Sequence, residues 1–137
     1  MSYVDKAYYT GIFKGNEIDD SDIDKSLRKA SRHIDTLTFN RIKGLGFEKL
    51  TDFQKDIIKE VTCELAEFEY ENAELIENVL SSYSINGVSM NFGGSWNVQL
   101  IKGVAIPTEL HETLKQTGLC SLSFMLTQAA LAAVNFN

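Results

Sequence analysis

The residues of this chain that could do chemistry are few and widely separated. The two cysteines, Cys63 and Cys120, match neither a metal-binding nor a redox spacing. His33 and His111 do not complete a metal site with any neighbouring residue. The sequence also lacks a nucleophile elbow, an HExxH motif, a Walker A loop and a dinucleotide-binding fingerprint. We therefore expect no enzyme activity, no metal and no cofactor.

Carboxylates are abundant along the whole chain, but in the second half few basic residues accompany them. Residues 1–59 hold 11 Lys and Arg and 10 Asp and Glu, whereas residues 60–137 hold 2 and 9. Nucleic-acid surfaces need Lys and Arg, so the second half is unsuited to binding phosphates. An acidic surface fits three interpretations: simple solubility, a basic protein partner, or a channel wall to which DNA must not adhere.

Paired-carboxylate catalysis is a further alternative for these acidic residues. The glutamates of residues 51–72 lie outside the apolar stripe of that segment, where a surrounding protein shifts a carboxyl pKa only weakly. No pair of them can be assembled into a site from their spacing. We therefore do not expect an acid–base centre.

The strongest structural pattern in the chain predicts a helix over residues 51–72, which carries several of these glutamates. Thr51 and Gln54 form a capping box at its start. Apolar residues recur every three or four positions along it: Phe53, Ile57, Ile58, Val61, Leu65 and Phe68. Such a stripe must be buried against a partner helix.

That partner is a second long helix, predicted from Asp22 to about Asn40 with Ser21 as its N-cap. Its apolar seam matches the first and comprises Ile23, Leu27, Ala30, Ile34 and Leu37. We expect the two helices to pack antiparallel, with Gly44 as a left-handed cap in the connection. Another face carries Lys25, Arg28, Lys29 and Arg32. This basic stripe is either solvated or docks on an acidic neighbour.

The residue pattern changes to a strand period beyond residue 82. Residues 83–90 alternate around Asn86–Gly87, which is the strongest short signal for a hairpin. Residues 96–106 alternate again around Lys102–Gly103. We expect a two- or three-stranded β element that projects from the helical body and packs on the helices or on another subunit.

Thr108 is then predicted to cap a short helix that ends at Gly118. The last segment, residues 119–137, carries no charged side chain. It is short for a membrane span and is interrupted by polar residues, so we expect burial in its own core or in a neighbouring subunit, and no membrane role. The N-terminus has no apolar signal-peptide core, and we expect synthesis in the cytosol with reduced thiols.

Together these patterns predict a mainly α fold: a small helical bundle with two long antiparallel helices, a projecting β-hairpin and a short C-terminal helix. We expect one domain over residues 1–137. Its predicted parts are a helical core at 1–82, a β-hairpin region at 83–106, a short helix at 107–118 and an apolar tail at 119–137.

Four segments carry a resemblance to a known family. They are KASRHIDTLTFNRI at 29–42, LTDFQKDIIKEVTCELAEFEYEN at 50–72, SSYSINGVSMNF at 81–92 and GVAIPTELHETLKQTGL at 103–119. In content and order they resemble the head–tail connector proteins, also called head-completion or adaptor proteins, of phages and prophages of Gram-positive bacteria. The chain departs from the family pattern after Leu119, where an apolar stretch replaces a short basic end.

The resemblance implies a structural virion protein that forms a ring, usually twelve-fold, between the portal and the tail. Such a ring extends the DNA channel and gives the tail a docking surface. The implied partners are copies of the chain, the portal protein and tail-terminator or neck proteins, while DNA passes through without specific binding. The implied location is the virion neck, and the host cytoplasm during assembly.

The hairpin and the tail then become candidate subunit or portal contacts. The candidate residues are Tyr83, Ile85, Val88, Met90, Phe92, Trp96, Leu119, Leu122, Phe124, Met125 and Leu126. The candidate channel-facing acidic residues are Glu64, Glu67, Glu71, Glu74 and Glu77. The alternative function is a small helical phage-encoded binding or regulatory module that acts on a host protein.

Overall fold

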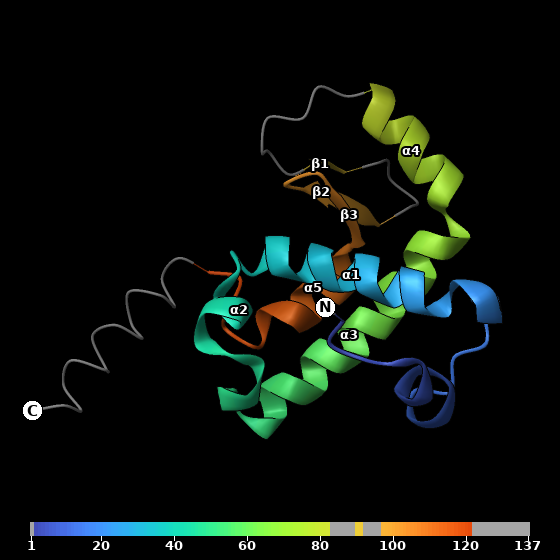
Figure 1. Ribbon diagram of the computed structural model, residues 1–137. Coiled ribbons are helices and arrows are strands. Elements are labelled where there is room, and N and C mark those ends of the chain that lie inside the picture. The colour runs from blue at the N-terminus through green and yellow to red at the C-terminus, as the bar shows by residue number, and fades with distance from the viewer. Residues whose placement is uncertain (1, 83–89, 92–96, 122–137) are drawn as a thin grey trace, which may run out of the picture.

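The computed structural model describes residues 2–82, 90–91 and 97–121 (Figure 1). The fold is mainly α, as the sequence predicts, with a small antiparallel sheet. Its elements are η1 Tyr8–Ile12, η2 Asp20–Asp22, α1 Ile23–Leu37, α2 Arg41–Leu45, η3 Phe47–Lys49, α3 Asp52–Glu71, α4 Ala73–Ser82, β1 Met90–Asn91, β2 Val98–Ile101, β3 Val104–Pro107 and α5 Thr108–Lys115. The hairpin predicted around Asn86–Gly87 lies outside the described residues.

Helix α3 begins with the predicted capping box. The Gln54 backbone N–H donates to Thr51 Oγ1 at 3.1 Å, and the Thr51 N–H donates to Gln54 Oε1 at 3.0 Å. The apolar stripe is buried at four of its six positions: Ile57, Ile58, Val61 and Leu65. Phe53 is 58% exposed, so its predicted place in the core is wrong; Leu50 is buried at this end of the helix instead.

Helix α1 crosses α3 and runs in the opposite direction (Figure 1). All five residues of its predicted seam are at most 3% exposed, which confirms the seam. The predicted ends of α1 are wrong. Its N-cap is Asp22, because Ser21 lies within the preceding 3-10 turn. The helix ends at Leu37 because Phe39 and Asn40 adopt left-handed φ angles of 57° and 59°, which stop helical hydrogen bonding.

The connection from α1 to α3 contains a helix that sequence patterns did not predict. Gly44 lies inside α2 and is not the left-handed cap. That role falls to Gly46, which has φ 92° and follows the last residue of α2.

The sheet has the order β1-β2-β3, and both strand pairs are antiparallel. Lys102 and Gly103 form the two-residue turn between β2 and β3, both with positive φ, as a tight hairpin requires. Strand β3 is buried on both faces: Val104 and Ile106 join the main core, whereas Ala105 joins a second cluster. That cluster also contains Val98 and Leu100 and packs against Phe68 of α3 and two residues of α4, Ile76 and Leu80. The sheet therefore packs on the helices.

Helix α5 follows β3 directly. Pro107 is its N-cap, and Thr108 is the first helical residue, so Thr108 is not the predicted cap. The helix ends at Lys115, before the predicted Gly118, which has φ 80° in the following turn. The Gln54 side chain donates to the Thr117 carbonyl at 3.0 Å and so ties the start of α3 to the end of α5.

The N-terminal segment is anchored by Tyr9, whose ring is fully buried. The Tyr9 hydroxyl donates to Glu67 Oε2 at 2.7 Å and accepts from the Ile18 N–H at 3.3 Å. Burial, followed by the hydrogen bond to Glu67, raises the pKa of Tyr9 to about 12. A Cβ on Gly15 would lie 2.3 Å from Tyr9 Cε1, so this ring requires glycine at residue 15.

We predict that Gly15→Ala destabilises the fold, because the new methyl group would clash with the fully buried ring of Tyr9. The expected loss in the free energy of unfolding, measured by urea denaturation, is about 1–3 kcal/mol. Gly44→Ala is the matched control: nothing lies within 4 Å of its added Cβ, and alanine favours the helix there. Equal stability of the two variants would contradict the close contact at Tyr9.

Candidate functional site

The first candidate surface is an acidic face on α3. Glu60, Glu64, Glu67 and Glu71 follow one another at steps of three or four residues, so they lie on one side of the helix. Glu69 lies nine residues, or two and a half turns, beyond Glu60 and pairs with His33 of α1. The acidic face therefore points away from α1.

The structure does not bring all five predicted channel-facing glutamates onto one surface. Glu67 accepts the hydrogen bond from the Tyr9 hydroxyl, so it holds the N-terminal segment against α3. Glu77 lines a hollow between α1 and α4, on the other side of the molecule from Glu64. Glu71 and Glu74 are exposed at the junction of α3 and α4. The predicted acidic wall is thus divided between two sides of one chain.

Three carboxylates line a groove of about 410 Å³ between α3 and α5, which we call the acidic groove. They are Glu60 and Glu64 from α3 and Glu109 from the first turn of α5. The remaining lining residues are Pro107, Leu110 and Thr113. Burial, followed by the charges of Glu60 and Glu109, raises the pKa of Glu64. These carboxylates repel one another, and a cation placed among them would relieve that repulsion.

The basic stripe of α1 lies on the side of the helix opposite its buried seam. Lys25, Arg28, Lys29 and Arg32 are all exposed. None of the four forms an ion pair with a residue in the part of the chain that the structure describes. Arg28 shares a shallow hollow with Asp5 and Asp24 without pairing with either. The stripe is therefore a set of free cations at regular spacing.

A hydrogen bond between His33 and the buried Glu69 joins α1 to α3 beside this stripe. His33 Nδ1 contacts Glu69 Oε2, and Glu69 is 8% exposed. The other carboxylate oxygen, Oε1, is buried and has no hydrogen-bond partner. Lys25 and Lys29 line a hollow together with Glu69. The His33–Glu69 pair fixes the crossing of α1 over α3.

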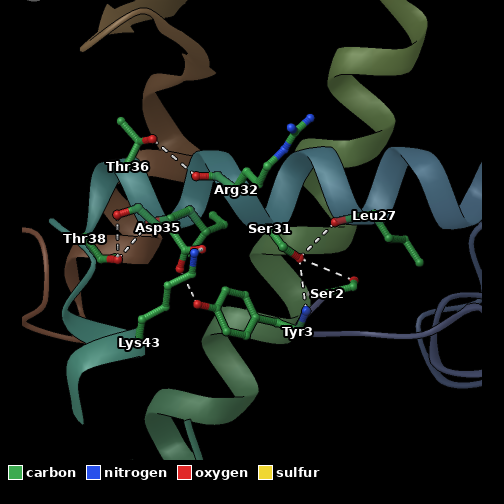
Figure 2. Close-up of polar contacts among 10 residues, drawn as sticks. Ser2, Tyr3, Leu27, Ser31, Arg32, Asp35, Thr36, Thr38 and Lys43 are labelled. Atoms are coloured by element: carbon green, nitrogen blue, oxygen red, sulfur yellow. Dashed lines mark hydrogen bonds and ion pairs between the residues drawn. The ribbon is translucent and has the colours of Figure 1, made fainter. Parts of the chain in front are cut away.

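Figure 2 shows a second polar cluster, which holds the N-terminal segment against α1. The Tyr3 N–H donates to Ser31 Oγ at 3.0 Å, and the Tyr3 hydroxyl donates to Asp35. Lys43 Nζ lies 3.5 Å from the other Asp35 oxygen. Burial and the contact with Asp35 raise the pKa of Tyr3. In the same view the Arg32 side chain points away from this cluster.

Arg41 is the residue that sequence analysis missed. It is 6% exposed, and its Nη1 donates to the carbonyls of Leu119 and Ser121, at 3.0 Å in the first case. Its guanidinium also lies 4.9 Å from the centre of the Phe39 ring. Arg41 thereby anchors the last described residues of the chain. The resemblance includes this position, but no periodicity distinguishes it from the other basic residues nearby.

The predicted contact residues are only partly described. Leu119 is fully buried in the main core, so packing within its own chain accounts for it. Met90 pairs through its backbone with Leu100 of β2. The other predicted contact residues lie outside the described residues: Tyr83, Ile85, Val88, Phe92, Trp96, Leu122, Phe124, Met125 and Leu126.

Comparisons with protein families, curated proteins and solved structures find no match to this chain. None of the helices described is long and apolar enough to cross a membrane. Across residues 2–82, 90–91 and 97–121, no three His, Cys, Asp or Glu side chains come together as a metal site.

We predict that Arg41→Ala loosens the segment that follows α5, because two carbonyls lose their buried donor. The expected loss in the free energy of unfolding is about 1–3 kcal/mol. Backbone amides of residues 117–121 should also exchange hydrogen faster, as measured by mass spectrometry. Arg32→Ala, at an exposed position, is the control and should change neither quantity. Unchanged exchange in Arg41→Ala would contradict the anchoring role.

A pH dependence follows from His111, which is buried in α5 with an unpaired Nδ1. Burial, and then the charge of Lys115, lowers the pKa of His111 below its ordinary value. The unfolded chain therefore binds a proton more readily than the folded chain, and stability falls as the pH drops below about 6.5. Urea denaturation between about pH 7 and pH 5 should show a smaller loss of stability for His111→Gln than for the wild type. Parallel curves for the two proteins would contradict this assignment.

Proposed function

We propose that this chain is a structural virion protein that forms a ring between the portal and the tail. The ring extends the DNA channel and presents a docking surface to the tail. The proposal includes no catalysis and no cofactor. The protein belongs to the virion neck in this proposal and assembles in the host cytoplasm.

The observation that carries the proposal is that the resembling segments form the parts of one packed unit. Segment 29–42 supplies most of α1, segment 50–72 supplies α3, and segment 103–119 supplies β3, α5 and the turn after it. These elements share the main core. An all-α core with a small β element is what the connector resemblance implies.

The TGL sequence at the end of the resemblance has a clear structural role that supports this argument. The Thr117 hydroxyl donates to the Leu114 carbonyl at 2.8 Å and accepts from the Leu119 N–H at 3.2 Å. Gly118 adopts a positive φ that favours glycine, and Leu119 enters the core. The three residues together close α5 and direct the chain toward Arg41.

Two features of the surface favour assembly over an isolated existence. The basic stripe of α1 and the acidic groove lie on different sides of the chain, so these two surfaces can meet only between copies. The residues from 122 to 137 carry no charged side chain, and such a segment favours burial in a neighbouring subunit or in the portal. Glu71 and Glu74, exposed and unpaired within the described residues, are the glutamates best placed for a channel wall.

We predict that the purified chain co-sediments with portal rings from the same gene cluster and forms a ring that caps them in electron micrographs. A chain that stops after Ser121 should keep its helical circular dichroism, because the Arg41 anchor and the core remain, but should fail to join the portal. The same images test whether Glu71 and Glu74 line the lumen.

Two outcomes would count against this proposal. A full-length chain that ignores portal rings and stays monomeric at high concentration would favour the alternative, a phage-encoded binding or regulatory module that acts on a host protein. A truncated chain that caps the portal as well as the full-length chain would remove the tail from the assembly contacts.

A further inference from the structure

We infer that the basic stripe on α1 of one copy docks into the acidic groove between α3 and α5 of the next copy. This inference rests on the proposed function, since it supplies the contact that would join neighbouring subunits of the ring. The partner is a second copy of this chain, and the recognition is between arginine or lysine side chains and carboxylates.

The first argument is that neither surface forms an ion pair within the part of its own chain that the structure describes. The stripe lies on the side of α1 opposite the seam that meets α3. The acidic groove lies on the side of α3 opposite the one that meets α1, half a turn from Glu69. The whole thickness of the two packed helices separates them, so a stripe and a groove can meet only when they belong to different copies.

The second argument is the match in spacing. Arg28 and Arg32 are four residues apart on α1, and Glu60 and Glu64 are four residues apart on α3. Each pair is therefore separated by about 6 Å along its helix. When α1 of one copy lies along α3 of another, both Arg–Glu pairs can form together. Arginine and carboxylate then match in bidentate geometry, which lysine cannot reproduce.

The third argument concerns the lining of the groove. Its two helices present Glu60 and Glu64 on one wall and Glu109 on the other, so a guanidinium entering it meets carboxylates from both sides. Pro107 and Leu110 offer apolar surface to the methylene stem of an arginine. Burial, and then the charges of Glu60 and Glu109, raise the pKa of Glu64, and an arriving cation would offset the repulsion among these carboxylates.

The two surfaces are different patches of the same molecule, and this fact determines the kind of assembly. Contacts of one patch with a different patch are heterologous, and they generate rings when the rotation closes. A groove that binds the stripe of the next copy leaves its own stripe free for the following one. Glu64 is then covered by the neighbouring subunit, which removes it from the channel wall and leaves that role to Glu71 and Glu74.

The test uses two charge-swapped versions of the full chain, Arg28→Glu/Arg32→Glu and Glu60→Arg/Glu64→Arg. In each variant the two substituted side chains have the same charge as the residues that they would meet on the next copy. Each variant alone should therefore self-associate about 100-fold or more weakly than the wild type. In a mixture every contact is again between opposite charges, and association should return. Sedimentation velocity, on the free chains and on chains assembled on portal rings, measures this at low and high salt.

Lys14→Glu/Lys49→Glu is the matched control for Arg28→Glu/Arg32→Glu, because it makes the same change in net charge at exposed residues outside the stripe. It should assemble like the wild type, and thermal melting should confirm that all variants fold. Association of the wild type should also weaken as salt screens the pairs.

Three assembly results would overturn the inference. They are normal assembly of either swapped variant alone, failure of the mixture to recover, and a wild type that neither self-associates in solution nor forms a ring on the portal. Binding of duplex DNA that depends on Arg28 and Arg32, with assembly unchanged, would reassign the stripe to nucleic acid and also overturn it. If the wild type caps portals and the charge-swapped variants do so equally well, this contact is rejected and the proposed function stands.

If the mixture of variants self-associates but no chain binds portal rings, this contact stands and the proposed function is rejected.

Discussion

The contact between α1 and α3 is the constraint on which the rest of this structure depends. Each helix carries one apolar stripe, and burying both stripes against each other fixes which sides of the two helices are left for the surface. The His33–Glu69 pair and the hydrogen bond from the Tyr70 hydroxyl to Asp22, at 3.0 Å, lie at the edges of this seam and set where the helices cross. The basic stripe and the acidic groove are consequences of that crossing.

The remaining elements are fastened to this pair by single polar side chains. Tyr9 holds the first segment through Glu67, Gln54 holds the end of α5 through Thr117, and Arg41 holds the chain after it. Tyr9 and Arg41 are buried, so the hydrogen bonds that they make would be costly to lose. A rigid subunit of this kind suits a ring, since closure of a ring requires each contact to repeat with the same geometry.

The basic stripe and the acidic groove give two sides of the molecule opposite charge. A chain with net charge −6 would be uniformly acidic if its charges were spread evenly, but here the cations of α1 and the carboxylates beside α5 are on opposite sides. In the proposed assembly, charge arranged in this way would steer association and set the register between copies more than it would add to affinity.

The sequence by itself determined the helices, the hairpin turn at Lys102–Gly103 and most of the core. It could do so because a capping box, a 3.6-residue period and a turn glycine act over a few neighbouring residues. Helix ends were less well determined: the left-handed Phe39 and Asn40 stop α1 early, and nothing in their types requires that conformation. Only the tertiary structure decided that Arg41 is buried, that Leu119 belongs to the core, and that the glutamates divide between two sides. Those facts depend on residues up to 80 positions apart in the chain, which no local pattern can relate.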